Sequence, residues 1–196
     1  MRLIAAALLA AVLFGGCSRN PQDQGAPPAS AEPATSAAPA PEGPAFQRDA
    51  KLDAFGFYMP TSDVQVGSLK LSLSSVGTPD EFRDWEAGKR EATHAPVMII
   101  FDDVSSPMQS NEMGGETHTV TVRVLPTRYA VTEKGLSFAG QDPRLGEVTF
   151  AGAWDMAAIK AAQAGNAASD SPVLTGRLTA GGKTFERVQF TWFGGD

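Results

Sequence analysis

Cysteine is nearly absent from this sequence, which has 196 residues and a single Cys at position 17. One thiol excludes an intrachain disulfide framework and any cysteine-based zinc finger. Basic residues are also in the minority, because 16 Lys and Arg stand against 22 Asp and Glu. Nucleic-acid phosphates require a basic surface, so this acidic balance excludes nucleic acid as the expected partner.

Catalytic and cofactor motifs are missing as well. The sequence contains no G-x-S-x-G elbow, no H-E-x-x-H pair, no phosphate-binding glycine loop and no EF-hand pattern. Of its two histidines, His94 precedes Ala95-Pro96, which is typical of a surface residue at a junction between a loop and a strand. A Ser-His-Asp triad from distant residues stays formally open, but nothing selects one. We therefore expect a binding protein rather than an enzyme, with no cofactor.

Residues 1–16 have the pattern of a secretory signal peptide. Arg2 provides a short positive start, and the apolar run from Leu3 to Phe14 is shorter than the roughly twenty residues that a membrane-spanning helix needs. Gly15 and Gly16 then precede Cys17 directly. Two alternatives follow: a lipid-modified Cys17, or an ordinary signal peptide that is cut elsewhere.

The segment LFGGC, from Leu13 to Cys17, resembles the lipobox of bacterial lipoproteins, although Phe14 stands where that class usually has leucine. The resemblance implies that Cys17 carries a diacylglyceryl group and becomes the acylated first residue of the mature protein. Several acyl chains meet the requirement that stable membrane anchoring takes more than one. Ser18 stands where an inner-membrane retention signal would have aspartate. The resemblance thus implies an outer-membrane lipoprotein, with its domain facing the periplasm.

Residues 17–45 are predicted to form a lipid-anchored, disordered tether. Seven of the fourteen prolines lie between Ser18 and Ala45, and that segment has no aromatic residue and no Val, Ile, Leu or Met. It cannot bury enough apolar surface to offset the entropy of ordering. Spaced prolines favour a semi-stiff polyproline II spacer, and a Pro-rich recognition motif is the alternative. Residues 46–196 have the composition of one globular domain, with 19 Asp and Glu against 14 Lys and Arg.

The apolar pattern of this domain is mainly that of strands. Alternating or continuous apolar runs predict strands at Leu69–Ser74, Val97–Phe101, Val120–Val124 and Lys183–Phe193, with weaker candidates at Leu145–Phe150 and Val173–Leu178. Gly181 and Gly182 predict a hairpin turn before the last strand.

Two short helices are predicted beside these strands. Thr78-Pro79-Asp80-Glu81 is a capping box with proline at the first helical position, and Asp155 is the expected N-cap of a helix over Ala157–Ala164. The fold class is therefore mainly β (α+β), an antiparallel sheet or small sandwich with two short helices.

The most informative segment is the connection from Asp102 to His118, which we expect to be a long loop between two strands. Structureless loops longer than about twelve residues are usually functional or disordered. Asp102, Asp103, Glu112 and Glu116 make the segment acidic, and it has no Lys or Arg. It is therefore a solvated connector, a docking loop for a basic protein partner, or a metal site.

The metal hypothesis for this segment has two forms. The four carboxylates suit Ca²⁺, whereas Met108, Met113 and His118 are evenly spaced ligands that suit Cu(I). Neither spacing matches a strong metal-binding motif.

Aromatic residues gather at both ends of the domain, at Phe55–Tyr58 and at Trp192–Phe193. They predict core plugs or paired terminal strands, with a sugar-stacking surface as the alternative. Taken together, the sequence predicts a lipid-anchored envelope protein whose domain binds another envelope component. It would be an accessory or inhibitor/immunity-type module, and in one version it is an inhibitor that neutralises an envelope-damaging enzyme. A small-ligand or metal-binding lipoprotein is the alternative.

Overall fold

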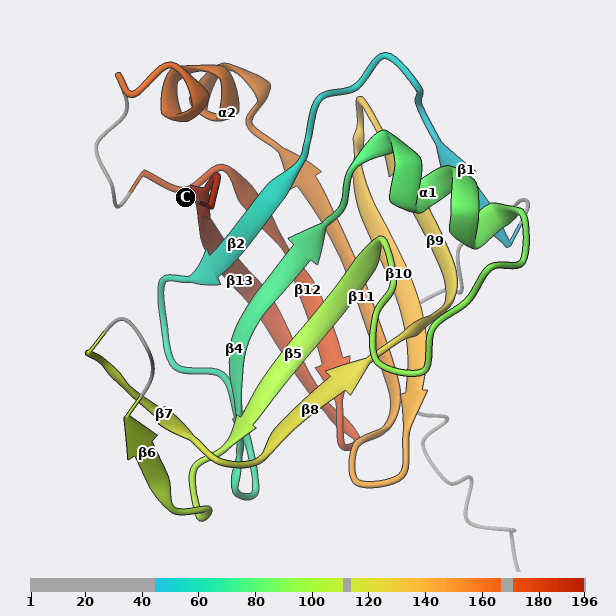
Figure 1. Cartoon of the computed structure of the whole chain (residues 1–196). Helices are drawn as coiled ribbons and strands as arrows, with labels where there is room; N and C mark the ends of the chain where they lie inside the picture. Colours follow the sequence, from blue (N-terminus) through green and yellow to red (C-terminus); the bar gives the residue numbers. More distant parts are fainter. Residues whose placement is uncertain (1–44, 111–113, 167–170, 196) are drawn as a thin grey trace, which may run out of the picture. The chain divides into compact units, whose positions relative to one another are not determined.

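The computed structural model describes residues 45–110, 114–166 and 171–195. Eleven of the strands form one large sheet (Figure 1). Along the sheet, the neighbouring strands are β1 (Phe46–Arg48), β9 (Pro126–Thr132), β10 (Gly135–Asp142), β11 (Gly146–Trp154), β12 (Leu174–Ala180), β13 (Lys183–Phe193), β2 (Gly56–Pro60), β4 (Leu69–Val76), β5 (Val97–Asp103) and β8 (Thr121–Val124). The short strand β3 (Gln65–Val66) also pairs with β4.

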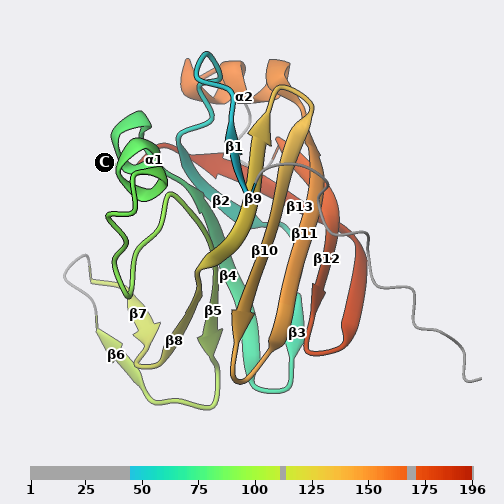
Figure 2. The same cartoon turned by 90° about the vertical axis from the view of Figure 1, so that its right-hand side faces the viewer.

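The sheet curls so that its two halves face each other. In Figure 1, strands β2, β4, β5 and β8 form a front half, and strands β9 to β13 lie behind them. The chain passes from β8 through Leu125 straight into β9, which joins the halves on one side. Gly140 on β10 permits this closure, because an added Cβ would lie 2.5 Å from the Leu125 carbonyl oxygen. Figure 2 shows the two halves from the side.

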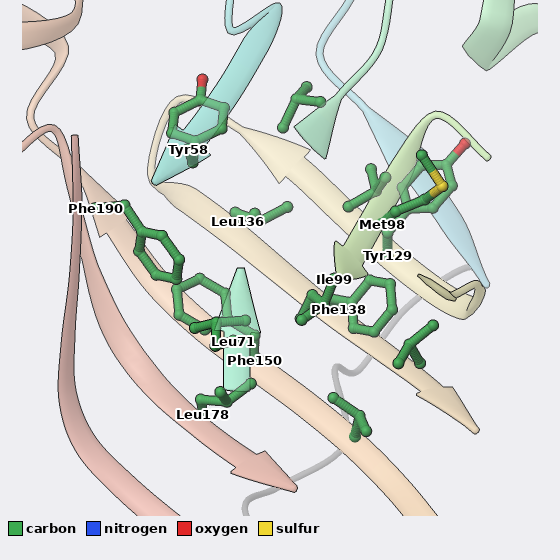
Figure 3. Close-up of a cluster of buried hydrophobic side chains, with 14 of the residues drawn as sticks. Tyr58, Leu71, Met98, Ile99, Tyr129, Leu136, Phe138, Phe150, Leu178 and Phe190 are labelled. Atoms are coloured by element: carbon green, nitrogen blue, oxygen red, sulfur yellow. The ribbon is translucent and has the colours of Figure 1, made fainter. Parts of the chain in front are cut away.

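The core fills the space between the two halves. Figure 3 shows buried side chains from the front strands, such as Tyr58 and Ile99, with Phe138, Phe150 and Phe190 from the back strands. The rings of Phe150 and Phe190 meet edge to face, with centroids 5.6 Å apart. Apolar burial of this extent is the main stabilising contribution to such a domain.

Buried tyrosines each have a hydrogen-bond partner. The Tyr58 hydroxyl donates to the Ala54 carbonyl at 2.6 Å, and burial raises the pKa of Tyr58. The Tyr129 hydroxyl donates to Glu86 Oε1 at 2.8 Å, and burial together with this carboxylate raises the pKa of Tyr129. Both phenols therefore remain neutral hydrogen-bond donors.

The two helices form where their capping signals stand. Helix α1 (Pro79–Glu86) begins after Thr78, whose hydroxyl accepts from the Glu81 backbone N–H, and the Glu81 carboxylate accepts in return from the Thr78 N–H. Helix α2 (Met156–Gln163) begins after Asp155, whose carboxylate accepts from the Ala158 N–H at 2.9 Å. The prediction of two short helices is confirmed.

The mainly β prediction is also confirmed, with β4, β5, β8, β11, β12 and β13 at the expected strands. Gly181 and Gly182 have positive φ angles and join Ala180 to its partner Lys183, as a two-residue hairpin requires. Most of the pairing is antiparallel, but β1 runs parallel to β9. Strands β9 and β10 were not predicted. Each has only two large core-facing side chains in alternation, Tyr129 and Val131 on β9 and Leu136 and Phe138 on β10, and so short an alternation does not indicate a strand.

The expectation of a structureless loop from Asp102 to His118 is wrong. Asp102 and Asp103 belong to β5, and β6 (Met108–Ser110) pairs with β7 (Glu116–His118) in a separate two-stranded ribbon. The ribbon is held by hydrogen bonds between backbone groups, which form whatever the side chains are. Because its side chains are mostly polar and exposed, the sequence has no apolar alternation there that would indicate strands.

Candidate functional site

Four large apolar side chains lie exposed on the paired strands β2 and β13 and the residue before β2. This aromatic patch consists of Phe55, Phe57, Met59 and Phe193, each between 37% and 49% exposed. Phe57 is the direct cross-strand partner of Phe193, and their ring centroids are 6.5 Å apart. Of the two expectations for the aromatic ends, core plugs or paired terminal strands, the structure shows paired strands, with Tyr58 turned into the core.

Gly56 and Trp192 position the outer end of this patch. Trp192 Nε1 donates to the Phe55 carbonyl at 2.9 Å. Gly56 has φ +142°, and a Cβ at this position would lie 2.2 Å from Trp192 Nε1. Only glycine therefore allows the indole to cross the backbone here and hold Phe55 at the surface.

The β6–β7 ribbon leaves the sheet through a turn built on Asp103. The carboxylate of Asp103 accepts from both the backbone N–H and the hydroxyl of Ser105, and its carbonyl accepts from the Ser106 hydroxyl. The Thr119 N–H then donates to the Pro107 carbonyl at 2.9 Å, where the ribbon returns. These bonds place Met108 directly opposite His118.

A cleft of about 430 Å³ lies between this ribbon and the ends of β2 and β4. We call it the ribbon cleft; its lining includes Met59, Asp63, Lys70, Asp102, Val104, Met108, Glu116 and His118. Three carboxylates and one ammonium line it, so its charge is negative. Lys70 Nζ lies 2.7 Å from Asp63 Oδ1, and the Thr121 hydroxyl donates to Asp102 Oδ1 at 3.1 Å.

The structure separates the four carboxylates expected on the docking loop. Asp102 and Glu116 line the ribbon cleft, whereas Glu112 lies outside the described residues. The carboxylate of Asp103 is buried and pairs with Arg144 of the turn between β10 and β11. Hydrogen bonds from Ser105 and this ion pair hold the pKa of Asp103 well below its ordinary value. Asp103 therefore joins two parts of the sheet and does not face solvent.

The three expected soft ligands are also divided. Met108 and His118 share the ribbon cleft, whereas Met113 lies outside the described residues, as does Cys17. Met59 from β2 takes a place beside them that sequence analysis missed. Phe57, Tyr58 and Met59 are all apolar, so the sequence gave no signal that Met59 faces outward. Among the described residues, no three His, Cys, Asp or Glu side chains gather as a metal site of those types would require.

A larger hollow, of about 560 Å³, lies between α1 and the loop that follows it. His94 Nε2 lies 2.5 Å from Glu81 Oε1 there, and the hydrogen bonds from Thr78 and His94 lower the pKa of Glu81 despite its partial burial. Glu81 already caps α1, and the lining of this hollow, all within the described residues, includes no Ser, Thr or Cys as a nucleophile. The pair ties the loop to the helix.

Comparisons with protein-family models, curated proteins and solved structures gave no match for this chain. Within the part of the chain that the structure describes, no helix is long and apolar enough to span a membrane. The aromatic patch and the ribbon cleft adjoin at Met59. Together they form one surface that combines exposed apolar side chains with an excess of carboxylates.

Proposed function

We propose that this protein is a lipid-anchored component of the bacterial outer membrane whose domain binds a protein partner in the periplasm. The partner would present apolar side chains beside basic ones. The aromatic patch is the observation on which the proposal depends. Contiguous exposed apolar side chains with a polar rim are typical of protein-binding surfaces, whereas single exposed ones are ordinary. Phe and Met are also enriched in such interfaces.

The charge of the ribbon cleft favours a basic partner. Asp63, Asp102 and Glu116 outnumber Lys70 there, and residues 46–196 carry an excess of acidic groups. Negative potential steers a basic protein during encounter and repels acidic ones. A partner that spans Met59 would therefore place apolar groups on the patch and basic groups in the cleft.

The proposed anchor at Cys17 would strengthen this binding. A lipid-linked tether over residues 17–45 keeps the domain near the membrane and raises the effective concentration of a partner there. An inhibitor of an enzyme that attacks the cell wall is one class of protein with these requirements.

Site-specific photo-cross-linking tests the proposed surface directly. A photoreactive phenylalanine analogue would replace Phe57 or Phe193 in the full lipidated chain, in cells of its source organism, with exposed Thr127 on β9 as the control position. We expect Phe57 and Phe193 to capture the same protein, through a peptide that carries Lys or Arg beside apolar residues. Identical products from Thr127, or an acidic captured peptide, would overturn the proposal.

Matched variants then separate the apolar and electrostatic contributions to binding. Phe57→Ser with Phe193→Ser should weaken binding of the captured protein about tenfold or more at any salt concentration, because central aromatic contacts dominate interface energies. Asp102→Asn with Glu116→Gln should mainly slow association, and this effect should shrink as salt screens the charges. Unchanged affinity and association rate in both variants would place the interface elsewhere.

A further inference from the structure

The ribbon cleft brings together three side chains that are distant in the sequence and carry soft or borderline donor atoms. Met108 and His118 are direct cross-strand partners on β6 and β7. Met59, on β2, lines the same cleft. Because side chains of directly paired residues lie on the same side of a two-stranded ribbon, the thioether of Met108 and the imidazole of His118 are neighbours.

The imidazole of His118 is oriented by a hydrogen bond of one ring nitrogen. Its Nδ1 lies 3.2 Å from the Ser106 carbonyl oxygen, which can only accept a hydrogen bond. The neutral ring therefore carries its proton on Nδ1 and keeps the lone pair on Nε2. Metal-binding histidines are commonly held in this way, by donation from the other nitrogen to a backbone carbonyl.

Both methionines are exposed instead of packed. Met59 is 41% exposed and Met108 is 49% exposed, although methionine usually fills gaps in a core. The unbranched side chain has three rotatable bonds, so each thioether can adjust its position within the cleft. Thioether sulfur and imidazole nitrogen together favour Cu(I) over the harder Ca²⁺, Mg²⁺ or Mn²⁺.

The carboxylates of the cleft give it a negative potential that favours a cation. Asp63 is engaged by Lys70, and Asp102 accepts from Thr121. With Glu116, these groups leave the cleft with more negative than positive charge. A monovalent cation gains from this potential.

We propose that the ribbon cleft binds one Cu(I) ion through Met59 Sδ, Met108 Sδ and His118 Nε2. Binding involves no change in oxidation state and no covalent step. The site shares Met59 and the cleft with the proposed partner-binding surface, but Phe57 and Phe193 are not among its ligands, so Cu(I) binding and partner binding can be tested separately.

Anaerobic titration of the full mature chain with Cu(I), against a colorimetric Cu(I) chelator, tests the proposal. Ag(I), which has the same preference for soft donors and no accessible redox step, is the second probe. In a parallel preparation Cys17→Ser removes the single thiol, so that binding cannot be due to that sulfur. We expect one equivalent of either ion to bind in both preparations.

Three variants then test the ligand set. Met59→Leu, Met108→Leu and His118→Asn should each weaken Cu(I) binding at least tenfold. Leucine conserves the volume of methionine and the changed side chains lie at the surface, so melting without metal should stay nearly the same. Met98→Leu, a buried methionine outside the cleft, and Phe57→Ser should leave Cu(I) affinity unchanged.

The outcomes are decisive in either direction. Loss of the bound equivalent in all three variants, with both controls intact, supports the site. Failure of the chain to retain Cu(I) against the chelator overturns it. Binding that survives Met59→Leu but is lost in Met113→Leu overturns the assignment of Met59.

Discussion

Arg144, in the turn between β10 and β11, donates to the buried carboxylate of Asp103 at the end of β5. The two residues stand 41 positions apart and join the back half of the curled sheet to the front half. The same carboxylate organises the turn into the β6–β7 ribbon through Ser105. The Asp103 side chain thus holds the front and back halves of the sheet together and also fixes the start of the β6–β7 ribbon, which lines the ribbon cleft.

Asp103→Asn should lower the melting temperature at neutral pH. The melting temperature of the variant should also fall less than that of the wild type as the pH is lowered. Because the folded pKa of Asp103 lies below its unfolded value of about 3.9, the stabilisation is present above that value and is lost as pH falls through the folded pKa. The difference between wild type and variant should therefore be largest near pH 7 and shrink below about pH 4.

Thermal melts at pH 7 and at pH 2.5 measure this difference. Asp63→Asn is the control, because Asp63 pairs with Lys70 at the surface, where its side chain is 79% exposed and such pairs contribute little. An equal destabilisation of wild type and Asp103→Asn by acid would contradict the assigned role of Asp103.

Gly56→Ala should destabilise the domain by about 1–3 kcal/mol, because it combines an unfavourable backbone conformation with a collision at Trp192. Urea denaturation followed by tryptophan fluorescence measures both the midpoint and its slope. Gly67→Ala is the matched control: its φ is +60° and an added Cβ meets nothing within 4 Å, so its cost should be smaller. Equal costs at the two glycines would show that Trp192 does not restrict position 56.

Thr78→Ala should cost about 1 kcal/mol, because α1 loses the hydroxyl that accepts from the Glu81 N–H. Thr78→Ser keeps an oxygen at the N-cap and should recover most of that stability. The free energy of unfolding, from denaturation of the three proteins, checks the expectation. Destabilisation of Thr78→Ser as large as that of Thr78→Ala would assign the effect to packing instead of capping.

Cys17→Ala should abolish lipid attachment and leave the chain as an uncut precursor or as a form without its anchor. The basis is the position of the single cysteine directly after Gly15 and Gly16. Mass spectrometry of the mature N-terminus in wild type and variant checks this. An unmodified N-terminus at another residue of the wild-type protein would contradict the lipoprotein hypothesis.

The sequence alone determined the elements that obey local rules. Thr78 and Asp155 begin helices because their side-chain oxygens accept from backbone N–H groups only three residues away. Gly181 and Gly182 form a hairpin because both take positive φ angles, which glycine adopts without steric cost. Alternation along Lys183–Phe193 likewise predicts which residues, such as Val188 and Phe190, face the core.

Only the tertiary structure decided which segments meet. Alternation assigns a residue to a face of its strand but does not choose the partner strand, which depends on how the whole chain buries its apolar surface. The pairing of β2 with β13 therefore places Phe57 beside Phe193 from the other end of the domain. The curl of the sheet brings Asp103 to Arg144, and the ribbon places Met108 and His118 beside the same cleft as Met59. Sequence spacing cannot reveal such sites, because long-range packing sets these positions.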